Sequence, residues 1–205
     1  PGFYSWSTKY LLADSTYKND YPTIAIFNSM LLKEYFENNH YHFAHSFAFD
    51  PVLNDGLRNA LEKIPEQVRK KKQILVYGRP GTERNAFNLV VAALKKWVFM
   101  QPDIEEWEIL SAGEMHRTVA LGNGKELTSV GKLSIEEYAN MLEESYAGIS
   151  LMCSPHPSYP PLEMSVFDVK TITNTYANKD LKDFNENIIS LDNISPMNIA
   201  KHLVE

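Results

Sequence analysis

Two cations and one carboxylate each follow a short apolar run of the sequence, and together they could bind a phosphorylated ligand. Arg79 comes directly after the run 73–78, Lys132 ends the stretch "LTSVGK", and Glu163 follows the run 148–154. Arginine and lysine neutralise phosphate oxygens, and a carboxylate accepts hydrogen bonds from sugar hydroxyls. The set suits a ligand that combines a diphosphate with a hydroxylated ring.

These residues need a scaffold that brings strand ends together, and the hydrophobic pattern predicts one. From residue 73 onward, continuously apolar runs alternate with helical patterns, which is typical of parallel strands covered on both faces. The predicted strands are 23–27, 73–78, 107–113, 127–134, 148–154, 169–174 and 187–192. The predicted fold class is α/β, with a Rossmann-like, doubly wound parallel sheet.

Ligands of such a sheet bind beyond the carboxyl ends of the strands, so the residues after each strand are the candidates. Besides the cations, they include Gly78, Gly131, Asn174, and the pair Glu114 and His116. His116 fits a polar surface residue better than a general base.

Three helices carry local start signals. Ser29 can cap a helix that follows the first strand, and Ser134 with Glu137 forms a capping box. Ser195 followed by Pro196 is a cap and first-turn pair.

The segment "SPHPSYPPLEM", residues 154–164, prepares a fourth helix start. Pro160 or Pro161 suits the first turn, with Ser158 or Tyr159 before it as the cap. Glu163 is then expected in the first turn, where free amides and the helix dipole keep it ionised. It can grip sugar hydroxyls there, or it can simply cap its helix. His156, held by rigid prolines, has a structural role or contacts the sugar.

Composition excludes several function classes. The chain has 205 residues, a net charge of −6 and one cysteine, Cys153, inside an apolar run. These features argue against a nucleic-acid-binding surface and a disulfide framework. "HYHFAH" (40–45) lacks a carboxylate or cysteine at ligand spacing, so no metal site is predicted. No run is long enough to span a membrane, and a cytoplasmic protein is expected.

The chain is expected to contain parts of two domains. Residues 1–55 carry one predicted strand and one helix and form the end of an N-terminal domain, whereas 56–205 form a C-terminal domain. The basic stretch 64–72 is a solvated boundary rather than a binding patch. Both ends break inside patterned sequence, so a fragment of a longer protein is expected.

Several motifs resemble a known family. "GRPGTERN" (78–85), "VGKLS" (130–134) and the glutamate after the fifth strand resemble the C-terminal nucleotide-sugar domain of GT-B glycosyltransferases. Within that group the sequence resembles the WsaF and rhamnan-synthesis family of rhamnosyltransferases, through "SAGE", "EYA", "SPHPSYPPLEM" and "ITN". The likeness covers 73–192 and extends back over "IAIFNSMLLKEYF" and "FAFDP".

The resemblance implies retaining, metal-independent transfer of rhamnose from dTDP-rhamnose to a polysaccharide of the cell envelope, without a further cofactor. Arg79 and Lys132 would be the catalytic cations on the donor diphosphate, and Glu163 would hold the ribose hydroxyl. Other implied binding residues are Tyr159, Arg84 at the place of the family's lysine, His156, Gly78 and Gly131. Pro155 replaces the first glutamate of the wider group's Glu-x7-Glu motif, which puts the identity of the sugar in doubt.

Alternatives remain at this stage. The chain could be a non-catalytic nucleotide-sugar-binding module, or part of a transferase that uses a UDP- or GDP-sugar. A NAD-dependent enzyme is disfavoured, because no G-x-G-x-x-G follows a predicted strand. Without most of the acceptor-binding domain, the chain alone is expected to bind a nucleotide but to transfer no sugar. In the full-length protein, peripheral membrane association is compatible with these features.

Overall fold

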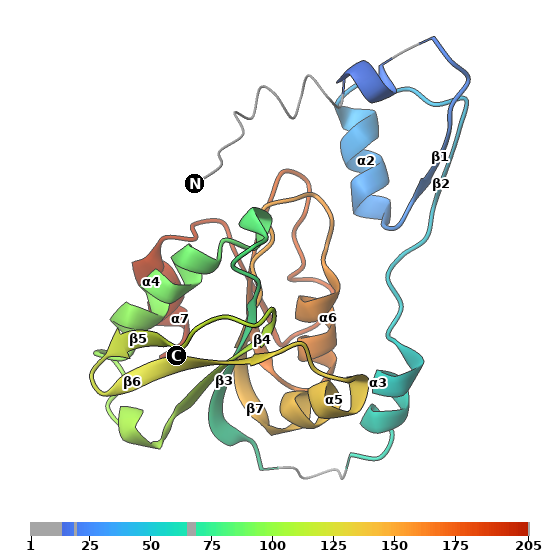
Figure 1. The fold of residues 1–205 in the computed structure, drawn as a ribbon. Coiled ribbons are helices and arrows are strands. Elements are labelled where there is room, and N and C mark those ends of the chain that lie inside the picture. The colour runs from blue at the N-terminus through green and yellow to red at the C-terminus, as the bar shows by residue number, and fades with distance from the viewer. Residues whose placement is uncertain (1–13, 19, 65–68, 205) are drawn as a thin grey trace. The chain divides into compact units, whose positions relative to one another are not determined.

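A computed structural model describes residues 14–18, 20–64 and 69–204, which divide into two compact units (Figure 1). The smaller unit contains the described residues up to Val52, together with Pro155–Pro157 and Ala177–Lys179. The larger unit contains the described residues of Leu53–Ser154, Ser158–Tyr176 and the chain from Asp180 onward.

The smaller unit is built on two parallel strands, β1 (Ile24–Phe27) and β2 (His45–Ala48), joined through helix α2 (Met30–Asn38). The Ser29 hydroxyl oxygen accepts a hydrogen bond from the Leu32 amide at 3.1 Å, which confirms the predicted cap. Aromatic rings pack inside the unit, with Phe36 centred 5.3 Å from Phe27. Strand β2 corrects the prediction, because only one strand was expected in residues 1–55.

The larger unit is built around one sheet. Among the described residues, its strands are β3 (Lys71–Gly78), β4 (Glu108–Gly113), β5 (Val119–Gly122), β6 (Lys125–Gly131), β7 (Ser145–Ile149), β8 (Lys170–Asn174) and β9 (Ile188–Leu191). Their order is β5-β6-β4-β3-β7-β8-β9, and each neighbouring pair is parallel except β5 and β6. The chain winds outward from β3 to one side, then returns and winds to the other. The predicted doubly wound sheet is confirmed.

The predicted alternation of strand and helix fails in two places. Between β4 and β6 the chain forms a hairpin with the antiparallel strand β5, which turns at Asn123 and Gly124. Both residues have positive φ, 50° and 70°, as tight hairpin turns require. Between β8 and β9 the fully described connection consists of turns and isolated bridges rather than a helix.

Helices cover both faces of the sheet (Figure 1). Helices α4 (Phe87–Trp97) and α7 (Pro196–His202) lie on one face, and α3 (Asp55–Leu61), α5 (Ile135–Glu144) and α6 (Tyr159–Val166) on the other. Central strand β3 serves both layers: Ile74 and Val76 pack with α4 and α7, whereas Leu75 packs with α5 and α6. This alternation on a strand buried from both sides explains its continuously apolar sequence. Short 3₁₀ turns η1 (Glu83–Asn85) and η2 (Ile104–Glu106) precede α4 and β4.

Candidate functional site

The strand order fixes where a ligand site belongs. Strand β3 lies between β4 and β7, so the chain's direction of winding reverses at this point of the sheet. Loops that leave neighbouring strands on the two sides of such a point diverge and form a crevice at the strands' carboxyl ends. The loop after β3 carries Arg79, and the loop after β7 leads through the proline-rich segment to Glu163. We call the end of the sheet at which β3 and the strands parallel to it finish the carboxyl edge, and the end at which they begin the amino edge.

The two predicted catalytic cations follow strands whose ends are in register. Gly78 pairs with Gly113, and Ala112 pairs with Gly131, so the strands before Arg79 and Lys132 finish at about the same level. One strand, β4, separates them, which places their backbones about 10 Å apart at the usual strand spacing. Long side chains can converge on one diphosphate across that distance. Neither cation forms an ion pair with any residue that the structure describes.

Steric constraints explain why glycine occupies positions 78 and 131. A Cβ atom on Gly78 would lie 1.9 Å from the Ser111 hydroxyl oxygen, so only glycine allows β3 and β4 to end with this packing. Gly131 has a φ of +70°, a conformation that residues with a side chain rarely adopt, and its Cβ would meet Met115 at 2.8 Å. Both glycines therefore shape the backbone immediately before a cation.

The loop after β7 is held on one side by the 3₁₀ turn η1 and on the other side by the end of β8. On one side, the Asn85 side chain donates to the Leu151 carbonyl at 3.1 Å, and the Cys153 amide donates to the Arg84 carbonyl at 2.7 Å. The backbone of Arg84 thus ties two loops together, while its exposed side chain, the predicted third cation, has no ion-pair partner among the described residues.

On the other side, Asn174 at the end of β8 fastens the same loop. Its side-chain oxygen accepts from the Met152 amide at 2.7 Å, and its side-chain nitrogen donates to the Met152 carbonyl at 3.2 Å and to the Thr175 carbonyl at 2.8 Å. Asn174 is almost fully buried, so these bonds form in a medium that strengthens them. The proline-rich segment therefore starts from a fixed point. The positioning roles of Asn85 and Asn174 were not predicted.

Helix α6 begins at one of the two predicted positions, because Ser158 was one of the two expected caps. Ser158 is the N-cap with a φ of 69°, Tyr159 is the first helical residue, and Pro160 and Pro161 fill the next two positions. Glu163 is consequently the fifth residue of the helix and lies in its second turn, which corrects the predicted first-turn position. Free amides belong to the first turn, so Glu163 is not placed to cap them. This removes the simplest structural role for its carboxyl group.

The surroundings of Glu163 also correct its predicted ionisation. Burial raises the pKa of its half-buried carboxyl above the ordinary value, and the nearby Tyr138 hydroxyl lowers it only in part. The Tyr138 hydroxyl is itself buried without a hydrogen bond of standard geometry, and burial together with the Glu163 charge raises its pKa. No described lysine or arginine pairs with Glu163. A half-buried carboxyl with a raised pKa and no cation partner is a candidate for a functional site.

Tyr159 and His156, two further predicted site residues, belong to different compact units. Tyr159, at the start of α6, exposes 38% of its surface and stands four positions before Glu163, one helical turn away. His156 belongs to the smaller compact unit, so the structure does not group it with the residues of the carboxyl edge. The expected contact of His156 with a sugar therefore remains a prediction.

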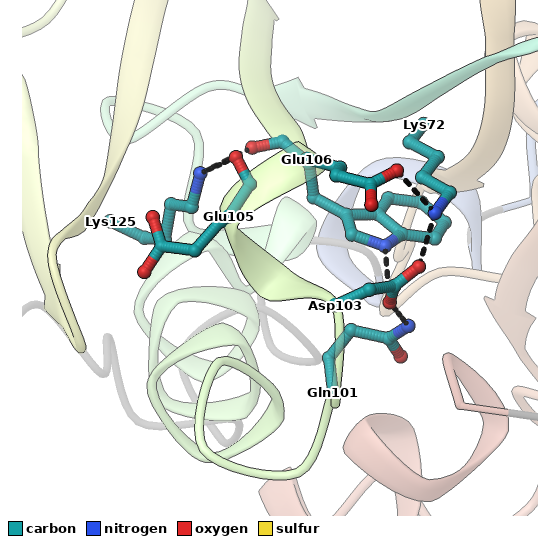
Figure 2. Close-up of polar contacts among 7 residues, drawn as sticks. Lys72, Gln101, Asp103, Glu105, Glu106 and Lys125 are labelled. Atoms are coloured by element: carbon teal, nitrogen blue, oxygen red, sulfur yellow. Dashed lines mark hydrogen bonds and ion pairs between the residues drawn. The ribbon is translucent and has the colours of Figure 1, made fainter.

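The amino edge has a different kind of charge arrangement (Figure 2). Lys72 lies between Asp103 and Glu106 and bonds to both, while Lys125 donates to the carbonyls of Glu105 at 2.8 Å and Trp107 at 2.9 Å. The pKa of the Asp103 carboxyl is held well below its usual range, first by the bond from Lys72. These cations are satisfied by partners within the fold.

A hollow of about 430 Å³ at the amino edge is lined by residues 69–73, Glu106 and Glu108. Its charges have both signs. Lys71 pairs with Glu144 at 2.6 Å, and Lys70 donates to the carbonyls of Leu142 at 3.0 Å and Phe167 at 2.6 Å near two helix ends. Lysines commonly stabilise helix C-termini in this way. Lys70, Lys71 and Lys72 therefore have bonding partners within the fold.

No described group of three or more His, Cys, Asp or Glu side chains could hold a metal ion. Within the same residues, no helix combines the length and the hydrophobicity that crossing a membrane requires.

Sequence comparison identifies two matching domain families. Residues 72–204 match the family described as "WsaF, C-terminal domain", and residues 1–30 match "WsaF, N-terminal domain". The O-antigen biosynthesis protein RfbC of Myxococcus xanthus is 33% identical over 175 residues, which are 85% of this chain and 13% of RfbC.

Comparison of structures gives the fold. A sucrose-phosphate synthase from Thermosynechococcus elongatus has a TM-score of 0.62 at 13% identity, over 97% of this chain and 52% of that one. An alpha,alpha-trehalose-phosphate synthase (UDP-forming) from Burkholderia vietnamiensis has a TM-score of 0.63 at 9% identity, over 88% of this chain and 50% of that one. The predicted GT-B fold is confirmed. The chain spans about half of these proteins and a much smaller part of RfbC.

Proposed function

The chain belongs to the WsaF family, and from this membership we propose that it is the nucleotide-sugar-binding part of a glycosyltransferase that acts in polysaccharide synthesis. The full-length protein would transfer a sugar from a nucleoside diphosphate to a growing polysaccharide, as the name of the RfbC relative suggests for O-antigen. We further propose dTDP-rhamnose as the donor, retention of configuration, and no requirement for a metal ion.

One observation supports this proposal most strongly: two cations at the carboxyl edge, Arg79 and Lys132, have no anionic partner among the described side chains. They follow strands that end in register on one side of the winding reversal, where ligands of doubly wound sheets bind. A diphosphate is the ligand class that two uncompensated cations at this separation suit. Its binding would place the nucleoside toward the loop after β7.

In the proposed reaction, an acceptor hydroxyl forms a bond to the anomeric carbon while the bond from that carbon to the diphosphate oxygen breaks. The leaving nucleoside diphosphate takes the bonding electron pair and gains negative charge, and the acceptor hydroxyl loses its proton. Arg79 and Lys132 would stabilise that developing charge, because both are positioned before the reaction starts. Glu163 would accept a hydrogen bond from the ribose 3′-hydroxyl, the only free ring hydroxyl of a thymidine nucleotide.

The assignment of thymidine and rhamnose depends on residues in which the chain differs from the wider GT-B group. Pro155 replaces the first glutamate of the Glu-x7-Glu motif, so the group that contacts the transferred sugar is changed. A deoxyhexose has fewer hydroxyls to bind, and a deoxyribose needs a single carboxylate. These two matches favour a dTDP-deoxyhexose over a UDP- or GDP-sugar.

A ligand panel tests the proposal. Thermal denaturation of the chain would be measured with TDP, UDP, GDP and dTDP-rhamnose, followed by calorimetry on any ligand that raises the melting temperature. We expect TDP and dTDP-rhamnose to bind with the highest affinity and the chain alone to show no transfer. Preference for UDP or GDP would replace the donor assignment, and absence of binding to every nucleotide would refute the proposed function.

A further inference from the structure

The loop that carries Arg79 is fastened at both ends by one residue, Glu114, which directly follows the neighbouring strand β4. The Glu114 amide donates to the Gly78 carbonyl at 3.0 Å, immediately before Arg79. The Glu114 carboxylate accepts from the Gly81 amide at 3.0 Å, two residues after Arg79. The short turn between them is closed by a third bond, from the Thr82 amide to the Arg79 carbonyl at 2.9 Å.

The backbone around Glu114 is fixed by hydrogen bonds that involve Ser129 of β6 and Ser111 of β4. The Ser129 hydroxyl donates to the Glu114 carbonyl at 3.3 Å and accepts from the His116 amide at 3.1 Å. The His116 ring donates through Nδ1 to the Arg117 carbonyl at 2.8 Å, so its Nε2 accepts from the Ser111 hydroxyl at 2.8 Å. These bonds fix the backbone around Glu114, from which its carboxylate reaches the Gly81 amide.

We propose that Glu114 is a positioning residue that holds the Arg79 loop in the conformation that binds the donor diphosphate. This proposal rests on the proposed function. Glu114 is not suited to contact the ligand itself, because an anionic side chain beside the Arg79 loop repels a diphosphate. Its carboxylate bonds to a backbone amide in that loop, which suits a role in ordering the turn. Ordering the loop before the ligand arrives reduces the conformational entropy lost on binding.

The Arg79 side chain also depends on this strand. A Cβ atom built on Gly113 would lie 3.2 Å from the Arg79 Cγ and 3.1 Å from the Gly78 carbonyl oxygen. The arginine's aliphatic stem therefore lies over the glycine that directly precedes Glu114. If the bond between Glu114 and Gly81 is lost, the turn can move away from β4 and take this stem with it.

Two substitutions separate positioning from charge. Glu114→Gln keeps an oxygen that can accept from the Gly81 amide and removes the repulsive charge, so TDP should bind as tightly as to the wild type or more tightly. Glu114→Ala removes the acceptor together with the repulsive charge, and TDP binding should weaken by about two- to tenfold, the range that corresponds to the net contribution of one typical hydrogen bond. Gly81→Ala places a Cβ 2.8 Å from the carboxylate and should weaken binding in the same direction.

Calorimetry with TDP would be carried out on the 205-residue chain, its three variants, Arg79→Ala, and the Arg79→Ala/Glu114→Ala double variant. Glu126→Ala, which removes an exposed charge near the start of β6, is the matched control and should bind TDP as the wild type does. We expect Glu114→Ala to have little effect on TDP binding once the Arg79 side chain is absent, because Glu114 acts through that side chain. Hydrogen exchange of the Gly81 amide should also be faster in Glu114→Ala.

The outcomes distinguish the two proposals. If Arg79→Ala weakens TDP binding and Glu114→Ala leaves it unchanged, the role of Glu114 is overturned while the proposed function stands. Equal tightening by Glu114→Gln and Glu114→Ala would overturn it too, since the residue would then act only by repulsion. If the wild-type chain bound neither TDP nor another nucleoside diphosphate, the proposed function would fail and the role of Glu114 with it.

Discussion

Replacing Glu163 with glutamine should change stability and ligand affinity in opposite directions. Glutamine has nearly the same volume and keeps one acceptor oxygen, so Glu163→Gln creates no cavity in the half-buried site on α6. It does remove the charge. The effects of the substitution therefore report what the charge contributes to folding and to binding, rather than what the side chain contributes by packing.

The effect on stability follows from the raised pKa. The ordinary pKa of a glutamate is 4.5, and burial raises the pKa of Glu163 in the folded protein. The folded protein then holds this proton more tightly than the unfolded chain does. The contribution of Glu163 to stability is greatest below pH 4.5 and is lost as pH rises through the raised folded-state pKa. At pH 7 the glutamine variant should be at least as stable as the wild type, with an advantage that shrinks in acid.

The effect on binding is the reverse. If the carboxylate accepts a hydrogen bond from the ribose, its loss weakens binding by about 1–2 kcal/mol, near the low end for hydrogen bonds to charged groups. That corresponds to an increase in Kd of roughly five- to thirtyfold. Thymidine and TDP should lose the same factor, because the contact is to the sugar and not to the phosphates.

Calorimetry with thymidine and TDP, and chemical denaturation at pH 7 and near pH 4, measure the two effects. Glu126→Gln, an exposed carboxylate on β6, controls for net charge and should change neither. Equal Kd values for wild type and Glu163→Gln would refute the ribose contact. A variant clearly less stable than the wild type at pH 7 would refute the burial argument, because it would mean that the folded protein stabilises the charged form.

Three further outcomes are expected. Arg79→Ala and Lys132→Ala should each weaken TDP binding by about 1.5–3 kcal/mol at an unchanged melting temperature, and calorimetry showing parental affinity would remove that residue from the site. EDTA should leave TDP binding unchanged in the same assay, whereas a strict need for Mg²⁺ or Mn²⁺ would contradict the assignment of charge stabilisation to these cations. Gly78→Ala should lower stability to denaturant by about 1–3 kcal/mol through overpacking against Ser111, and Ser111→Ala should restore part of it; full stability of the single variant would refute the steric argument.

Local signals in the sequence were sufficient for the helix starts. Ser134 and Glu137 form the predicted capping box, with the Ser134 amide donating to the Glu137 carboxylate at 2.8 Å. Ser195 accepts from the Asn198 amide and is followed by Pro196 at the first helical position. Caps are predictable because all partners lie within four residues of each other. The hairpin before β6 had an equally local signal, Asn123 followed by Gly124, and could have been predicted from it.

The positioning of the site was not predictable in the same way. Asn85 and Asn174 hold the loop after β7 from elements 66 and 22 residues away in sequence, and Glu114 reaches a loop 33 residues away. Nothing near these residues in the sequence indicates such partners. The environment of Glu163 was misjudged for a related reason. Its turn within α6 depends on where the helix begins. Its pKa depends on burial within the tertiary structure, which raises it, and on the Tyr138 hydroxyl, which lowers it in part.

Strand β3 carries basic residues at both of its ends, and their partners separate a structural role from a binding role. At the amino edge Lys70, Lys71 and Lys72 bond to helix carbonyls or carboxylates within the fold. At the carboxyl edge Arg79 has no such partner among the described residues, although Glu114 is close enough to bond to its loop. A fold that needed the Arg79 charge for stability would be expected to pair it with that carboxylate. Instead Glu114 bonds to the backbone of the loop, which leaves the guanidinium available to an anionic ligand. The contrast between two ends of one strand is therefore a stronger argument for a phosphate site than the presence of an arginine after a glycine.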